Sequence, residues 1–403
     1  MNKRQFLQSG LALAGGGLSW RVWAAPEAAR AAADARLVVM FLRGAYDGLS
    51  LLVPYKEDFY YESRPSIALA RPDEASPLAA LALDADWALH PALAGSLLPL
   101  YQAGQLAFVP FAGTEFVSRS HFQAQDWVEA GLAPGGGLSL ASGFLNRLLQ
   151  RLGVTGQAVS FTQSLPVALR GARSVANTPV RVAAGQSLAV EHESLLLQMY
   201  AGHSLRPLVE EGIGLRRELS QDLAAEMQAA SRSALPASGF ALEAGRIAHF
   251  LREHKEYAVA FMDVGGWDSH ANQGGAQGAL ANRFGNLGTG LASFAAGMGS
   301  EWRKTVVVVI SEFGRTFREN GTKGTDHGHG SAMWVLGGGV KGGRIFGEQQ
   351  RLRAKDLHQD RDVPVLNPYR NVLAGLLGRM YGLDAAATGF VFPESTPRNF
   401  GIL

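Results

Sequence analysis

The sequence contains no cysteine, which excludes disulfide bonds, thiolate metal ligands and thiol nucleophiles. Any metal ion must therefore be held by oxygen and imidazole ligands. The sequence also lacks a large excess of charge of either sign, because it has 37 basic and 35 acidic side chains and a formal net charge of only +2. A nucleic-acid-binding protein of this size would show a concentrated basic excess, so we expect no nucleic-acid partner.

Long hydrophobic runs are absent after the N-terminal segment. No window there holds about 18 consecutive apolar residues, so we expect no membrane span once that segment is removed. The segment itself has Lys3 and Arg4 before a Phe-Leu pair, then an apolar, glycine-rich stretch and alanine-rich sequence. This pattern predicts a twin-arginine-type signal peptide over residues 1–30, the alternative being a surface amphipathic helix. We expect export by the twin-arginine machinery, into the periplasm if the source is Gram-negative.

The remaining residues, 31–403, are expected to form a single α/β domain. Hydrophobic residues make up 47% of the chain and charged residues 18%, which is typical of a globular protein with a substantial core. Short apolar, β-branched runs predict five buried strands: Leu37–Leu42, Leu106–Pro110, Ala258–Val264, Thr305–Ile310 and Met333–Leu336. Apolar residues at helical spacing predict three helices: Pro91–Gln102, Leu242–His254 and Leu280–Met298. This alternation predicts a mainly parallel central sheet with helices on both faces, in three layers.

The turns beside these strands carry acidic and imidazole side chains among glycines. Six such residues are Asp47, Asp268, His270, Glu312, Asp326 and His327. In open α/β sheets, ligands bind outside the carboxyl ends of the strands, where such turns meet. We therefore expect the six side chains to lie close together.

A metal site would explain this gathering of charge. Four carboxylates in one place would repel one another unless a cation compensates them. Two divalent cations, with zinc the expected metal, would do so, with His270 and His327 as nitrogen ligands and His329 as a further candidate. Paired cations roughly 3.5–4 Å apart can clamp the attacking and leaving oxygens of an in-line displacement. The alternative is that each acid caps a helix or pairs with a nearby base such as Arg43 or Arg315.

A second group of polar residues follows the second predicted strand. A helix is expected from His121, so Ser120 stands at or near its N-cap, where the helix dipole favours an oxyanion. Ser120 is therefore a candidate nucleophile, with Thr114 a weaker one. Arg119 or Arg315 would hold the non-bridging oxygens of a substrate, and His121 is a candidate general acid or metal ligand. The alternative is that Ser120 only caps the helix.

Five segments together resemble the exported bacterial family known as domain of unknown function 1501: LRGAYDGLSLLVPY, SRSHFQAQDW, GGWDSHANQ, VVVVISEFGRT and GTDHGHGSAMWVLGGGVKGG. The resemblance runs from about Leu37 to the C-terminus. That family is grouped with the alkaline phosphatase and sulfatase superfamily, whose members hydrolyse phosphate or sulfate esters with metals held above a central sheet. The resemblance thus implies an alkaline-phosphatase-like fold.

The resemblance also implies roles for single residues. Asp47 matches the acid after the first strand that bridges to one metal. Asp268 and His270 resemble ligands of the other metal, and His327 resembles the late histidine ligand. Ser120 falls near the position of the superfamily's nucleophile.

Two positions depart from the superfamily pattern. Glu312 and Phe313 stand where an Asp-His pair is usual, which removes one nitrogen ligand. The nucleophile segment also lacks the Cys-x-Pro-x-Arg pattern of sulfatases. One metal site is therefore expected to be weak, remodelled with Asp326, or empty.

Two functions remain open at this point. The first is an exported metal-dependent hydrolase that acts on a phosphate or sulfate ester, in a small molecule or a polymer. The second is a non-catalytic exported protein of the same fold that binds a partner or a cell-surface polymer. Phe313 favours the second function, whereas Asp268, His270 and His327 favour the first.

Overall fold

The structure, a computed structural model, describes residues 35–135, 137–153, 157–178, 190–214 and 240–403. The predicted signal peptide, residues 1–30, lies outside these ranges and stays a prediction. Within the described ranges, no helix has the length and apolar character that crossing a membrane requires.

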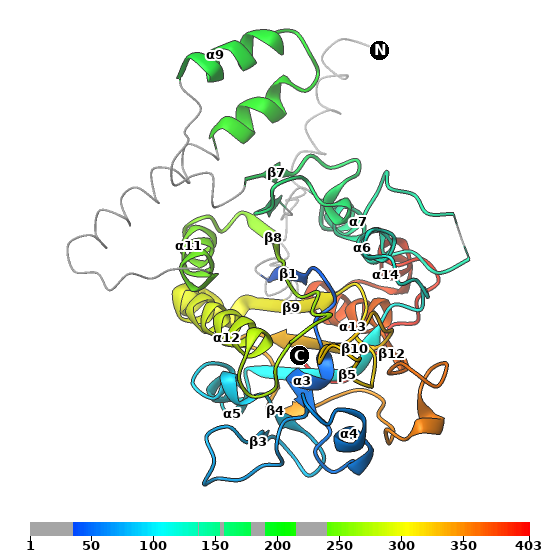
Figure 1. Cartoon of the computed structure of the whole chain (residues 1–403). Helices are drawn as coiled ribbons and strands as arrows, with labels where there is room; N and C mark the ends of the chain where they lie inside the picture. The colour runs from blue at the N-terminus through cyan, green and yellow to red at the C-terminus, as the bar shows by residue number, and fades with distance from the viewer. Residues whose placement is uncertain (1–34, 136, 154–156, 179–189, 215–239) are drawn as a thin grey trace, which may run out of the picture.

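A mixed, mostly parallel sheet lies at the centre of the described chain (Figure 1). Its strands follow the order β11-β5-β10-β9-β1-β8-β6-β7, and β12 also pairs with β5. Their bounds are β1 Arg36–Leu42, β5 Leu106–Gly113, β6 Gln157–Ser160, β7 Ala176–Asn177, β8 Tyr257–Val264, β9 Thr305–Ser311, β10 Ser331–Leu336, β11 Arg344–Ile345 and β12 Asn367–Pro368. Strand β10 runs antiparallel to both β5 and β9, and the other pairs are parallel.

Helices cover both faces of this sheet (Figure 1). The helices of the described chain include α3 Gly48–Leu51, α4 Asp58–Ser63, α5 Leu97–Gln102, α6 His121–Ala130, α7 Phe144–Leu152, α9 Val190–Met199, α11 Phe240–Glu253, α12 Ala279–Met298, α13 Tyr369–Tyr381 and α14 Ala385–Val391. Residues 206–214 are also helical. Short 3-10 turns are η1 Pro91–Leu93, η3 Val167–Leu169, η4 Gly299–Lys304 and η5 Ala354–Asp356. Helices α5, α11 and α12 pack on one face of the sheet, and α7 and α13 pack on the other.

Strand β1 shows why the fold has three layers. Its side chains alternate between the two faces. Val38 and Met40 join the core under α11 and α12, whereas Leu37 and Val39 join the core under α7 and α13. A strand with apolar residues at every position is thereby buried on both sides, as the continuous hydrophobic run predicts. The predicted three-layer α/β class is confirmed.

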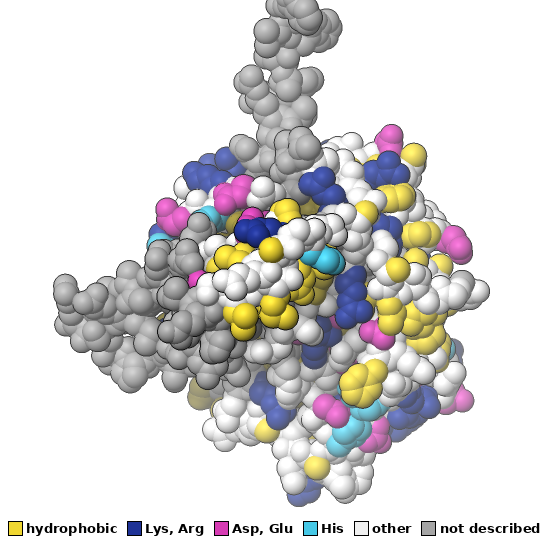
Figure 2. Space-filling model, turned by 90° about the horizontal axis from the view of Figure 1, so that it is seen from above, with side chains coloured by type: hydrophobic (Ala, Val, Ile, Leu, Met, Phe, Trp, Pro, Cys, Tyr) yellow, Lys and Arg dark blue, Asp and Glu magenta, His cyan; other side chains and the backbone are white. Residues whose placement is uncertain are grey.

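A small antiparallel sheet lies beside the main one, with β2 Leu52–Val53, β4 Ala88–Leu89 and β3 Leu81–Ala82 in that order. Figure 2 shows basic, acidic and apolar side chains interspersed over one face of the molecule.

The five predicted strands and two of the three predicted helices are present with small changes at their ends. The third helix, predicted over Pro91–Gln102, is divided into η1 and α5. The break contains Gly95, and glycine is a poor helix former. His90 caps η1, because its Nδ1 accepts a hydrogen bond from the Ala92 amide at 3.0 Å.

The direction of β10 decides which turns meet. The parallel strands β1, β8 and β9 end in register, with Leu42 opposite Val264 and Ser311. Because β10 is antiparallel to β9, its first residue, Ser331, lies at the same edge. The loop before β10 therefore joins the turns that follow the parallel strands.

Candidate metal centre

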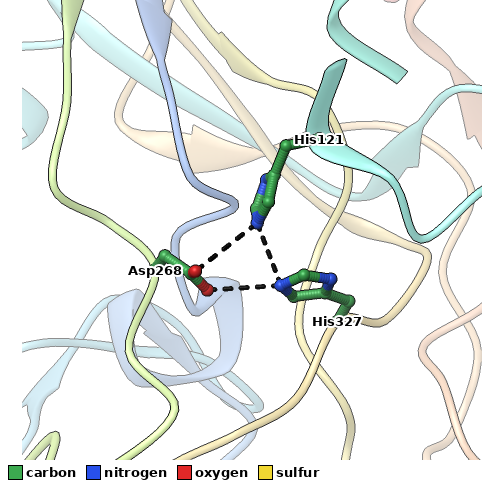
Figure 3. Close-up of side chains that lie close together, drawn as sticks. All are labelled: His121, Asp268 and His327. Carbon is green, nitrogen blue, oxygen red and sulfur yellow. Dashed lines mark hydrogen bonds and ion pairs between the residues drawn. The ribbon is translucent and has the colours of Figure 1, made fainter. Parts of the chain in front are cut away.

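Three side chains from distant parts of the sequence converge at this edge. His121 begins α6, Asp268 follows β8, and His327 precedes β10 (Figure 3). The Nε2 atoms of His121 and His327 lie 2.9 Å apart. Asp268 places Oδ2 3.6 Å from Nε2 of His121 and Oδ1 3.3 Å from Nε2 of His327. These atoms lie within 4.8 Å of one another, which is close enough for one metal ion to bind them all.

His270 adds a fourth donor next to this group. Its Nε2 lies 2.9 Å from Nε2 of His327 and 2.9 Å from Oδ1 of Asp268. The side chains of Asp268 and His270 are 44% and 45% exposed, so this side of the group opens to solvent. We call His121, Asp268, His270 and His327 the His-Asp cluster.

The Nδ1 atom of each imidazole in the cluster forms a hydrogen bond with an oxygen atom outside the cluster. Nδ1 of His121 lies 2.7 Å from Oε1 of Glu312, and Nδ1 of His270 lies 3.1 Å from Oδ1 of Asp326. Nδ1 of His327 lies 2.8 Å from the backbone carbonyl of Arg119. Because these oxygens only accept hydrogen bonds, each Nδ1 carries the proton. In the neutral rings the Nε2 lone pairs of His121 and His270 therefore both face Nε2 of His327.

The pKa values of His121 and His327 are shifted in opposite directions. The hydrogen bond with Glu312 raises the pKa of His121 despite the opposing effect of burial. Burial lowers the pKa of His327. Without a metal, a proton on Nε2 of His121 can therefore be donated to Nε2 of His327. A metal cation would take the place of this proton, because metal ligation requires neutral imidazole.

Asp268 is oriented by a buried guanidinium. Nη2 of Arg315 donates to Oδ1 of Asp268 at 2.9 Å, and the Arg315 side chain is enclosed by protein. Burial raises the pKa of Asp268, but the charges of Arg315 and His270 outweigh burial and lower it. Asp268 is thus held as a carboxylate. Arg315 acts through Asp268, since its own guanidinium does not reach the solvent-facing side of the cluster.

Close backbone contact brings Asp268 to the end of β1. Gly44 has φ +112, and a Cβ atom there would lie 2.7 Å from the backbone nitrogen of Asp268. A side chain at this position would push the Asp268 turn away from β1. The glycine is therefore needed both for its backbone conformation and for the approach of the two turns.

Asp47, predicted as a metal ligand, lies outside the cluster. It is buried and accepts two hydrogen bonds from Arg64, at 2.6 and 3.1 Å. Gln273 donates to the same carboxylate at 2.8 Å, and Ser50 does so at 2.7 Å. The backbone amide of Leu49 is a fifth donor, and it donates to Oδ1 of Asp47 at 3.2 Å. Nothing in the sequence around Arg64 signals this pairing.

Glu312 and Asp326, also predicted as ligands, stand behind the cluster. Oε1 of Glu312 accepts hydrogen bonds from the Gly44 amide at 2.8 Å and from Gln125 at 3.0 Å, besides its bond to His121. Oδ1 of Asp326 accepts from Asn320 at 3.0 Å as well as from His270. Both carboxylates therefore orient imidazoles, as is usual for the partners of metal-binding histidines.

The predicted catalytic segment lies at the rim of the cluster. Ser120 is the N-cap residue of α6, but its side chain makes no capping hydrogen bond. The half-exposed Arg119 side chain lies 3.5 Å from Asp362 and 3.4 Å from Gln359. Thr114 is buried and accepts a hydrogen bond from the Phe116 amide at 3.1 Å. The structure thus brings His121 into the cluster, with Ser120 next to it in the chain.

Phe313 and His329 complete the set of residues singled out in the sequence. The buried Phe313 ring lies beside those of His121 and His327, with centroid distances of 5.0 and 5.2 Å. It forms an apolar wall behind two candidate ligands. The ring of His329 lies beside that of His358.

The donor set fits a divalent cation such as zinc, which binds neutral imidazole nitrogen and carboxylate oxygen. The Nε2 atoms of His121 and His327 and the Asp268 carboxylate offer those donors within bonding reach of one point, and His270 adjoins them. The fixed Nδ1 protons leave the correct nitrogen free in each ring, which is the arrangement that metal-binding histidines require.

Several solved structures resemble this chain in fold. The lipoteichoic acid synthase LtaP from Listeria monocytogenes has 9% identity and a TM-score of 0.39, with 94% of this chain and 78% of that chain covered. A protein in the alkaline phosphatase superfamily from Vibrio parahaemolyticus has 11% identity and a TM-score of 0.34, covering 75% of this chain and 60% of that one. Ps i-CgsB in complex with a neocarrahexaose has 9% identity and a TM-score of 0.38, covering 90% and 75%.

These likenesses concern the fold alone. A search of curated protein sequences finds no match. Residues 34–389 match the family described as "Protein of unknown function (DUF1501)". Since the match spans most of the sequence, the chain belongs to the DUF1501 family.

Proposed function

We propose that the chain is an exported, divalent-cation-dependent hydrolase that acts on a phosphate or sulfate ester. One observation carries the proposal. Three imidazoles hold their Nδ1 protons on oxygen acceptors and direct Nε2 toward one another beside the Asp268 carboxylate. Such an arrangement is poorly stable with lone pairs alone, and a cation stabilises it.

The exposure of the cluster supports a catalytic rather than a purely structural metal site. Structural zinc sites are closed by four protein ligands, whereas catalytic sites keep a position open. Asp268 and His270 are nearly half exposed, so an ester group could reach the cluster from solvent. A bound cation would supply positive charge where negative charge develops on the ester oxygens.

Ser120 is the proposed nucleophile. Its Oγ would bond to the phosphorus or sulfur atom while the bond from that atom to the alcohol oxygen breaks. The hydroxyl proton would end on the departing alcohol. Water would then release phosphate or sulfate and restore the hydroxyl. The absence of a capping bond supports this role, because it leaves the Ser120 hydroxyl available.

Two arginines would serve different parts of the reaction. Arg119 precedes Ser120 and has a half-exposed side chain, so it could turn from Asp362 to the non-bridging oxygens of the ester. Arg315 is enclosed and holds Asp268, and is therefore a positioning residue.

The test compares the full chain with and without metal on aryl phosphate, phosphodiester and aryl sulfate substrates. We expect hydrolysis of one class, loss of it on chelation, and a lower melting temperature after chelation. His327→Ala should abolish both effects, whereas His249→Ala, on α11, should preserve them. A chain without bound metal and without activity would overturn the proposal.

A second function, non-catalytic binding of a partner or cell-surface polymer, is favoured by one observation. Phe313 closes one side of the cluster with an apolar ring. A metal-loaded chain that is inert on all three ester classes but is retained by an anionic polymer would support that function instead.

A further inference from the structure

We infer that the His-Asp cluster binds one metal cation per chain, and that the buried guanidinium of Arg64 takes the place of a second cation. The inference deepens the proposed function, because it rests on the same metal centre. It concerns Asp47, the predicted ligand that the structure places elsewhere.

The Asp47 carboxylate has no lone pair left for a metal. A carboxylate offers about four acceptor positions. Oδ2 accepts from Arg64, Ser50 and Gln273, and Oδ1 accepts from Arg64 and the Leu49 amide. A metal ion at Asp47 would have to break these bonds inside the protein.

Several hydrogen bonds hold the Arg64 side chain in this position. Its side chain is 0% exposed, and Nε donates to the Phe317 carbonyl at 2.7 Å. Nη2 donates to the Thr316 carbonyl at 2.9 Å in addition to Asp47. The pair is therefore a permanent part of the loops beneath the cluster, unlike a surface ion pair.

Gln273 joins this ion pair to the metal centre. It donates to Asp47 through Nε2, and its Oε1 accepts from Ser269 at 3.2 Å and from Thr325 at 3.0 Å. Ser269 and Thr325 are the neighbours of Asp268 and Asp326 in the chain. Asp47 thus supports the cluster through one intervening side chain, without being a ligand.

The charges around the cluster also match one divalent cation. Glu312, Asp326 and Asp268 contribute three negative charges, and Arg315 contributes one positive charge. Two negative charges remain, and one divalent cation balances them. Asp47 and Arg64 cancel each other. A second divalent cation would leave uncompensated positive charge, which is costly in a partly buried site.

The part of the chain that the structure describes offers no second set of donors nearby. Among the described residues, His121, Asp268 and His327 are the group of acidic and imidazole side chains whose donor atoms lie close enough to bind a cation together. His270 adjoins this group and belongs to the same centre.

Metal analysis of the purified full chain tests the inference. We expect one zinc ion per chain, both by elemental analysis and by calorimetric titration with zinc. Two ions with comparable affinity would overturn the inference and leave the proposed function intact. A chain that binds no zinc would overturn the proposed function as well, so the two failures are distinguishable.

Variants provide a second test. Asp47→Asn should keep one zinc ion per chain and lose less than about 10-fold in affinity, whereas Asp268→Asn, which removes a ligand, should lower the affinity by more than about 100-fold. Equal losses in the two variants would make Asp47 a ligand and overturn the inference. Arg64→Gln should admit a second, weaker zinc ion at the freed carboxylate, and the control Arg71→Gln, which alters an exposed ion pair, should not. If Arg64→Gln does not fold, the wild-type stoichiometry and the Asp47→Asn affinity still decide the matter.

Discussion

The imidazole of His121 and the carboxylate of Glu312 are joined by a hydrogen bond of 2.7 Å, although 191 positions separate them in the sequence. Glu312 is completely buried, and its hydrogen bonds with His121 and Gln125 outweigh burial and lower its pKa. The carboxylate fixes both the tautomer and the orientation of the ring that begins α6. The candidate metal centre is therefore assembled only when α6 docks on the end of β9.

Replacing Glu312 should weaken metal binding without removing a ligand. In Glu312→Gln the group that accepts the hydrogen bond from Nδ1 of His121 is neutral and is a weaker acceptor. Nε2 of His121 therefore becomes a weaker ligand for the metal. We expect metal affinity to fall about 10–100-fold, measured by calorimetric titration at constant pH. Glu348→Gln, at an exposed ion pair with Arg398, is the control and should leave the affinity unchanged. Unchanged affinity in Glu312→Gln would remove Glu312 from the support of the centre.

The sequence could predict the parts of this site that follow from local patterns and strand order, but it could not predict side-chain pairs that form only in the tertiary structure. Asp268, His270 and His327 lie in glycine-rich turns at strand ends, and the sheet topology alone brings them together. The same reasoning grouped Asp47 with them, whereas in the structure Asp47 pairs with Arg64. Its partner Arg64 is 17 residues away and is buried only in the tertiary structure, so no local pattern marks it. Strand and helix positions were predictable because hydrophobic spacing reports them locally.

A different prediction concerns acid stability and His90. Burial lowers the pKa of His90 from 6.5 to about 4. Protonation of Nδ1 would also break the hydrogen bond that it accepts from the Ala92 amide. The unfolded chain takes up this proton below pH 6.5 and the folded chain does not. The contribution of neutral His90 to the free energy of unfolding is therefore fully present above pH 6.5 and is lost as the pH falls toward about 4. The loss is about 1.4 kcal/mol for each pH unit in that window.

The variant His90→Asn isolates this effect. Asparagine retains an N-cap acceptor but does not titrate. Urea unfolding at pH 7.5 and pH 5 should show a smaller decrease in unfolding free energy for His90→Asn than for wild type. His249→Asn should behave as wild type. Equal decreases in all three proteins would show that His90 does not set the acid sensitivity.

Export remains to be tested on residues outside the described structure. A fusion of residues 1–40 to a reporter should be exported, and blocking the twin-arginine pathway should stop it. Replacing both Lys3 and Arg4 by alanine should abolish export, since this pathway reads the basic pair. Lys3→Arg should retain export, and Arg21→Ala should have little effect. Export that continues in the double variant would count against a twin-arginine signal.

The last prediction separates a nucleophile from a helix cap at Ser120. A lost capping bond costs about 0.5–2 kcal/mol of stability, but the Ser120 side chain makes no such bond. Ser120→Ala should therefore leave the melting temperature and the metal content unchanged while ester hydrolysis is abolished. Thr114→Ala should lower the melting temperature and leave ester hydrolysis in place. It removes a buried acceptor for the Phe116 amide, which costs about 1 kcal/mol of stability.

The two variants together assign the attacking group. Full activity in Ser120→Ala would exclude its hydroxyl and leave Thr114 or a water molecule as the nucleophile. A joint loss of activity and metal in Ser120→Ala would instead indicate that the change disturbs His121, the next residue. His121→Ala should lose metal and activity at once, because its Nε2 lies within the cluster. Only a selective loss of hydrolysis, with metal content and stability retained, identifies Ser120 as the residue that attacks the ester.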